Sequence, residues 1–224
     1  MIITEDKVDD IKEKKNFIKQ FLISNGLTEN EFVLHSYNGC KNMHTAGVLQ
    51  GLVQKHIPSA KVIVHFDRDQ RWNDEDPDIQ ILISKAQTHN IKLFITEQSE
   101  IENYFCSIQH LIQVFDIDEG QAEEILEEAH IELKETTLRK TKDFILNERS
   151  NLITDERGRI KSDELERIAS EAVDNQFDRI CPGKELLSLV KQKIQDRCSI
   201  GDTSIVVQPS SGLITNYIAT LIEE

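Results

Sequence analysis

Residues 61–69 read Lys61-Val62-Ile63-Val64-His65-Phe66-Asp67-Arg68-Asp69. The run from Val62 to Phe66 is rich in β-branched and aromatic residues, which is typical of a central strand covered on both faces of a parallel sheet. Two aspartates, Asp67 and Asp69, follow this run directly. Because ligands of an open parallel sheet gather beyond the carboxyl ends of its strands, both aspartates are candidate site residues.

Three further strands are predicted on either side of this stretch in the chain, at 2–4, 32–37 and 92–95. Each gap between strands holds apolar residues at helical spacing, within 15–26, 43–56 and 79–86. An alternation of strands and helices predicts an α/β fold, with an open, mostly parallel sheet and helices on both of its faces.

Beyond residue 115 the pattern becomes helical. A helix is predicted from Glu119, because apolar residues recur there at i, i+3, i+4 and i+7 in an acidic background. Two more helices are predicted at 163–177 and 185–197, then a short strand at 204–207 and a closing helix at 213–224. We therefore expect a core at 1–115, a helical second lobe at 116–180 and a C-terminal segment at 181–224 that returns to the core.

The composition indicates a helix-rich globular protein, with 38% hydrophobic and 29% charged residues. Its four cysteines are scattered without a CxxC pair, and the N-terminus lacks the features of a signal peptide, so we predict a cytoplasmic protein that does not enter membranes. The net charge of −14 disfavours broad binding to phosphate backbones. Residues 134–197 hold fourteen basic side chains and are the better candidate for such a contact.

Further carboxylates follow the other predicted strands. Glu5 ends the first strand, Asp9 lies four residues later, and Glu100 and Glu102 follow the fourth. Mg²⁺ and Mn²⁺ prefer oxygen ligands, and two such ions about 4 Å apart form an arrangement that cuts phosphodiesters. Taken together, the acids predict a two-metal site. Taken singly, each has a simpler interpretation: a polar loop, a surface charge, or for Glu100 and Glu102 a helix cap.

These motifs resemble those of the Toprim domain, which topoisomerases, primases and OLD-type nucleases share. The family pattern of Glu, Gly and Asp-x-Asp after successive strands is matched by Glu5, Gly39 and Asp67-Arg68-Asp69. Three further matches resemble the OLD-type nucleases: Asp9, the segment Glu100-Ile101-Glu102-Asn103-Tyr104, and a late Gly183-Lys184. Asp6 departs from the pattern, because many members have Gly at that position.

The resemblance implies a Toprim-like sheet and an Mg²⁺- or Mn²⁺-dependent endonuclease that cleaves DNA or RNA, tRNA included. It implies that one ion is held by Glu5, Asp9 and Asp67, and a second by Asp69, Glu100 and Glu102. Glu5, Asp67, Asp69 and Lys184 would be the catalytic residues. OLD-type domains commonly follow an ABC-type ATPase, and this sequence has no Gly-x-x-x-x-Gly-Lys-Ser/Thr loop. We therefore expect an ABC-type ATPase as a partner subunit or domain, as in anti-phage defence systems; a homodimer stays open.

Two other functions are compatible with the same residues. An aspartate-based phosphatase or phosphotransferase also places Asp-x-Asp after a strand, and would use Asp67 as its nucleophile without needing Glu5. A non-enzymatic regulatory or interaction module would instead use its acidic surface, especially the helix at 119–133, to bind a basic partner or to mimic nucleic acid. Residues 101–133 hold nine Asp or Glu and no Lys or Arg. Metal dependence and mutation of Glu5 and Asp67 distinguish these possibilities.

Overall fold

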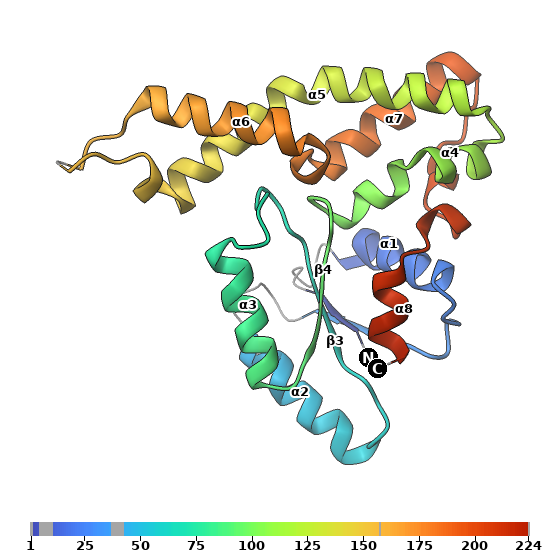
Figure 1. Ribbon diagram of the computed structural model, residues 1–224. Coiled ribbons are helices and arrows are strands. Elements are labelled where there is room, and N and C mark those ends of the chain that lie inside the picture. The colour runs from blue at the N-terminus through green and yellow to red at the C-terminus, as the bar shows by residue number, and fades with distance from the viewer. Residues whose placement is uncertain (1, 5–10, 37–42, 157, 224) are drawn as a thin grey trace.

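The computed structural model describes residues 2–4, 11–36, 43–156 and 158–223 (Figure 1). Four parallel strands form its sheet: β1 (Ile2–Thr4), β2 (Leu34–Ser36), β3 (Ile63–Phe66) and β4 (Lys92–Ile95). The helices beside the sheet are α1 (Ile11–Ser24), α2 (Met43–His56), α3 (Pro77–Thr88) and α8 (Asn216–Glu223). The predicted α/β class with a parallel sheet is confirmed.

Strand β3 is covered on both faces, as its composition predicts. Val64 and Phe66 pack with apolar residues of α2 and α3. Ile63 points to the opposite face, where it joins the core formed with α1 and Phe94 of β4. Since alternate residues of a strand face opposite sides, a continuous apolar strand requires two layers of helices, and the chain supplies both (Figure 1).

The strand order β2-β1-β3-β4 places β1 beside β3, with Thr4 in register with His65. From β1 the chain moves outward to β2 on one side, and it then crosses to β3 on the other side. In a parallel sheet such a reversal opens a crevice beyond the carboxyl ends of the two strands. Asp67 directly follows Phe66, the last residue of β3, and therefore borders this position.

A helical lobe lies across the carboxyl ends of β3 and β4, as Figure 1 shows. It contains α5 (Glu119–Glu148), α6 (Ser162–Ile180) and α7 (Gly183–Cys198), with α5 packed against the other two. Helix α4 (Ile108–Phe115) and the 3-10 helix η2 (Ile101–Cys106) connect this lobe to β4. Asp118 caps α5 by accepting the Gln121 N–H at 2.8 Å. Helices α5 and α6 lie within the stretch 116–180 where the second lobe is predicted, whereas α7, which packs against α5, belongs to the predicted C-terminal segment 181–224.

The strand predicted at 204–207 is wrong. Residues 204–206 form the 3-10 helix η4 (Ser204–Val206), and η5 (Ser211–Leu213) follows it. The buried ring of His110 on α4 organises this segment, with Nε2 2.6 Å from the Val206 carbonyl oxygen and Nδ1 2.6 Å from Ser210 Oγ. A side chain from a distant helix thus decides the backbone of a short apolar run that would otherwise suit a strand.

Candidate functional site

Asp67 is held at the carboxyl end of β3. It is only 2% exposed, and its Oδ1 accepts the backbone N–H of Ile101 at 3.1 Å. The same oxygen lies 3.4 Å from Nε2 of the buried His65. The first aspartate of the triplet is therefore a fixed group, because it joins the end of β3 to the start of η2.

Asp69 differs from Asp67 in backbone and exposure. Its φ of 53° lies in the left-handed region, which Asp enters more readily than most residues. Its N–H donates to the Ser99 carbonyl oxygen at 2.8 Å, while half of its side-chain surface (50%) is exposed. Loss of hydration where the protein covers its carboxyl group, together with the charges of Asp67 and Glu100, raises the pKa of Asp69 to about 6 against the opposing effect of Arg71. Asp67, Asp69 and Glu100 are thus electrostatically coupled.

Glu100 contacts α7, a helix distant in sequence. Its Oε2 accepts the backbone N–H of Lys184 at 2.9 Å, which satisfies one of the free donors at the start of that helix. The Lys184 side chain is 61% exposed, with its Nζ 3.9 Å from Glu100 Oε1. Glu102 is buried within η2. Glu100 is the N-cap residue of η2 and its N–H donates to Asn103 Oδ1 at 2.9 Å, so the expectation that it caps the next helix is confirmed. The contact with α7 is a second role that the sequence did not indicate.

Gly183 permits this approach of α7 to η2. A Cβ at position 183 would lie 2.5 Å from Asn103 Oδ1 and 3.0 Å from the Asn103 backbone nitrogen. Asn103 in turn donates from Nδ2 to the Cys181 carbonyl oxygen at 3.0 Å. The Glu-Ile-Glu-Asn-Tyr segment and the Gly-Lys segment, selected separately in the sequence, therefore lie in direct contact.

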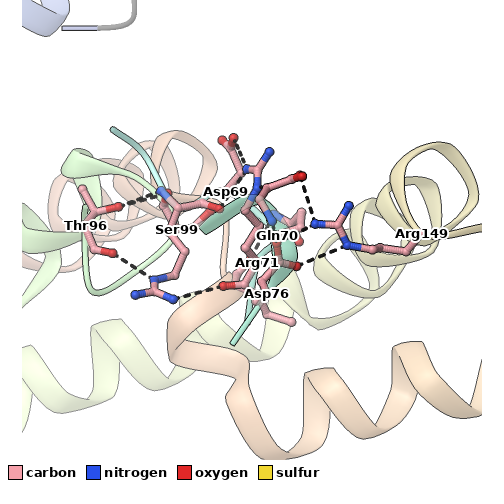
Figure 2. A network of polar contacts seen from close by, with 10 residues as sticks. Asp69, Gln70, Arg71, Asp76, Thr96, Ser99 and Arg149 are labelled. Atoms are coloured by element: carbon pink, nitrogen blue, oxygen red, sulfur yellow. Dashed lines mark hydrogen bonds and ion pairs between the residues drawn. The ribbon is translucent and has the colours of Figure 1, made fainter. Parts of the chain in front are cut away.

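The loop between Asp67 and α3 is held by a network of arginines (Figure 2). Arg71 pairs with Asp69 at 3.1 Å, and Arg149 at the end of α5 pairs with Asp78 at 2.9 Å. Arg68 donates from Nε to the Thr96 carbonyl oxygen at 3.0 Å, which links the loop to the end of β4. Side chains of both the sheet and the helical lobe thus determine where this loop lies.

The structure brings only some of the predicted site residues together. Asp67, Asp69 and Glu100 share the carboxyl edge of the sheet, while Glu5, Asp9 and Gly39 lie outside the described part of the chain. Within that described part, no three Asp, Glu, His or Cys side chains form a group that could hold a metal ion. The donor chemistry nevertheless suits a hard divalent cation, because the candidate ligands are carboxylates and the negative charges of Asp67 and Glu100 repel that of Asp69.

Many charges expected to face a partner are engaged inside the molecule. Basic side chains of the stretch 134–197 form ion pairs with acids of the same chain: Lys134 with Asp174, Lys140 with Glu185, Lys142 with Glu166, and Arg179 with Asp74. On α7, Lys193 pairs with Glu128 at 3.3 Å, and Arg197 pairs with Glu124 at 3.1 Å. The acidic face of α5 is therefore partly neutralised by α7, which reduces its value as a surface for a basic partner.

Sequence reasoning did not identify Arg71 and Arg149 as residues of this site. The alternation of signs in Asp67-Arg68-Asp69-Gln70-Arg71 was a signal for Arg71, since it places a cation two residues after Asp69. Arg149 had no such signal. Its partners Asp76 and Asp78 lie more than seventy residues away in the chain, and only the docking of α5 brings them together.

No protein-family model matches the chain, and the comparisons with curated proteins and with solved structures find no match either. The Toprim resemblance therefore stays a prediction that rests on the motifs. Among the described residues, no helix has both the length and the apolar character needed to cross a membrane.

Proposed function

We propose that the protein is a nuclease that cleaves phosphodiester bonds of DNA or RNA with the help of Mg²⁺ or Mn²⁺. One observation carries the proposal: Asp67 and Asp69 lie beyond the carboxyl end of β3, where the strand order reverses beside β1. Glu5 follows Thr4, the last residue of β1, directly in the sequence. Carboxylates from two adjacent strand ends are the donor set that a catalytic divalent cation needs.

Each described residue has a distinct part in this proposal. Asp67 provides a carboxylate whose direction is set by the Ile101 amide. Asp69 provides a second carboxylate that is half exposed and accessible to a ligand. The exposed ammonium group of Lys184 can bind a phosphate oxygen near Glu100. A divalent cation, when bound, supplies a water of lowered pKa and a positive charge facing the phosphate.

The burial of Asp67 supports a role as ligand more than a role as nucleophile. A nucleophilic aspartate must present an oxygen in line with the phosphorus atom, so it needs room for a phosphate group beside it. Asp67 is 2% exposed, and one of its oxygens already accepts the Ile101 N–H. This geometry favours the nuclease over the aspartate-based phosphatase.

The test is cleavage of single- and double-stranded DNA and RNA by the purified chain, with Mg²⁺, with Mn²⁺ or with a chelator. We expect cleavage with either cation, none with the chelator, and none for Glu5→Gln or Asp67→Asn. Asp163→Asn is the matched control, because it removes an acid from the first turn of α6 and not from the end of a strand. Unchanged cleavage by Asp67→Asn, or cleavage in the chelator, would exclude the proposal.

A further inference from the structure

We infer that Arg71 is a positioning residue that sets the Asp69 carboxylate for a divalent cation, and that the helical lobe holds Arg71 in place. This inference rests on the proposed function, because it assigns a role at the same site. It adds a requirement that the sequence motifs do not contain. The site is complete only when α5 packs against the loop that follows β3 and so holds Arg71.

Arg71 is largely buried and contacts two acids at once. Its side chain is 12% exposed, with Nη1 3.1 Å from Asp69 Oδ2 and Nε 3.5 Å from Asp78 Oδ2. Nη1 also donates to the Arg68 carbonyl oxygen at 3.2 Å. A guanidinium group can bridge several acceptors in a fixed plane, whereas a lysine ammonium acts as a single point charge.

Asp69 needs such a restraint because its main chain and side chain are fixed by different groups. The Ser99 carbonyl oxygen holds the backbone N–H at 2.8 Å, but this bond leaves the carboxylate free to rotate. The ion pair with Arg71 engages Oδ2 and so restricts the rotamer of a side chain that is half exposed. Groups that orient a metal ligand in this way typically contribute about 10- to 100-fold to metal affinity.

The helical lobe holds Arg71 through shared partners. Arg149, at the end of α5, pairs with the same Asp78 oxygen that Arg71 approaches, at 2.9 Å. The ring of Phe144 on α5 lies near both guanidinium groups, 5.6 Å from that of Arg71 and 5.1 Å from that of Arg149. Arg71 therefore cannot leave its position without disturbing α5.

The residues on either side of Arg71 are anchored to the same lobe. Gln70 donates to the Ile180 carbonyl oxygen of α6 at 3.2 Å and accepts the Thr141 hydroxyl of α5 at 3.2 Å. Trp72 packs between apolar residues of α5 and α6. Gln70, Arg71 and Trp72 thus tie the segment that carries Asp69 to the helical lobe.

Two possible roles of Arg71 predict opposite changes in metal affinity when the residue is removed. A cation beside Asp69 could simply compete with a metal ion for the carboxylate, and its removal would then tighten metal binding. If Arg71 positions the carboxylate, its removal weakens binding instead. The direction of the change in Mn²⁺ affinity therefore distinguishes positioning from competition.

The experiment measures the Kd for Mn²⁺ by calorimetry at one fixed pH on the full chain, in the absence of nucleic acid. We expect Arg71→Ala to raise the Kd at least about tenfold. Arg71→Lys should recover part of the affinity, because it keeps the charge and loses the bridge to Asp78. Arg167→Ala is the matched control, since this arginine forms two ion pairs on the exposed surface of α6, and its Kd should equal that of the wild type.

The outcomes separate this inference from the proposed function. If the wild-type chain does not bind Mn²⁺, the proposed function fails. If the wild type binds and both Arg71 variants bind equally well or more tightly, the positioning role is overturned. Fluorescence of Trp72, the one tryptophan of the chain, reports folding of each variant in a chelator. Should Arg71→Ala not fold, the Kd of Arg71→Lys decides, because the inference requires it to exceed that of the wild type.

Discussion

Among the Asp-x-Asp segments between residues 67 and 78, Asp67-Arg68-Asp69 and Asp76-Pro77-Asp78 have different electrostatic environments. In the second, Asp76 caps α3 by accepting the Asp78 N–H at 2.9 Å, and Arg149 pairs with both acids. Burial raises the pKa of Asp78, but the hydrogen bond and charge of Arg149 and the charge of Arg71 lower it overall. In the first segment, the pKa of Asp69 is raised to about 6.

The difference shows that the pattern Asp-x-Asp does not define a cation site by itself. What distinguishes the two segments is the balance between acids and nearby guanidinium groups. Asp76 and Asp78 have two arginines between them, whereas Asp69 has one arginine and faces the charges of Asp67 and Glu100. A divalent cation stabilises most strongly the acidic cluster whose negative charges have the fewest nearby cationic side chains.

The largest expected effect concerns cleavage. Asp67→Asn should lower Mg²⁺-dependent cleavage by about 100-fold or more, because it removes a charged ligand at the reacting phosphate. Asp76→Asn should leave cleavage near the wild-type rate, since asparagine is also a good helix cap. Initial rates with a labelled oligonucleotide measure both variants. Equal losses of cleavage in the two variants would show that the two Asp-x-Asp segments do not differ in function.

Next in size is the stability supplied by Arg149. Arg149→Ala should lower the free energy of unfolding by about 3 kcal/mol, because it leaves the largely buried Asp76 without its cationic partner and removes an ion pair from the more exposed Asp78. Urea unfolding followed by Trp72 fluorescence gives the value. Arg167→Ala breaks two exposed pairs instead and should cost at most about 1 kcal/mol. A smaller loss for Arg149→Ala than for Arg167→Ala would contradict the network.

Cation binding should also stabilise the folded chain. Mn²⁺ at about a hundred times its Kd should raise the free energy of unfolding by about 2.7 kcal/mol, because it binds the folded state alone. The gain should be lost in Asp69→Asn and retained in Asp76→Asn. Thermal unfolding with and without the ion measures it. A gain that persists in Asp69→Asn would place the ion elsewhere.

The smallest effect is a difference in pH dependence, measured in a chelator by urea unfolding between pH 4 and 7. The pKa of Asp69 rises from 3.8 to about 6 on folding, so its ionisation removes stability as the pH rises through this range. Asp69→Asn should therefore become more stable relative to the wild type as the pH increases.

Asp78 should give the opposite sign when the same urea measurement is extended below pH 4, because its pKa is lowered from 3.8 on folding. Its carboxylate therefore adds stability above pH 3.8 that is lost as the pH falls through the folded value. Asp78→Asn should be less stable than the wild type at pH 7, with a difference that shrinks toward acid pH. Parallel curves for the two variants would show that their environments are alike.

Some parts of the fold were predictable because the deciding interactions are local or periodic. Helix α2 spans Met43–His56 in both the prediction and the structure. The apolar run that ends at Phe66 indicated a central strand, and it lies between β1 and β4. The strand predicted at 204–207 failed because contacts with His110 and Asp202 set its backbone, and neither is part of the run's apolar pattern.

The candidate site also contains both residues that the sequence could predict and contacts that it could not. Asp67 and Asp69 could be selected from the sequence, because their place after a central strand implies the carboxyl edge of a sheet. The role of Glu100 as an acceptor for α7 could not, because Lys184 follows it by 84 residues. Nor could the contact of Gly183 with Asn103, which depends on how closely α7 approaches η2.

The sequence by itself determined the class of fold, the central strand and the acids that follow it. Hydrophobic periodicity and chain order encode those features over a few neighbouring residues. Only the tertiary structure decided which acids have a cationic partner. The guanidinium groups that pair with them lie on helices distant in the sequence, as Arg149 shows with Asp76 and Asp78. Coulombic interactions depend on distance in space and not on separation in the chain, so Asp69 and Asp78, each the last residue of an Asp-x-Asp segment, have opposite pKa shifts.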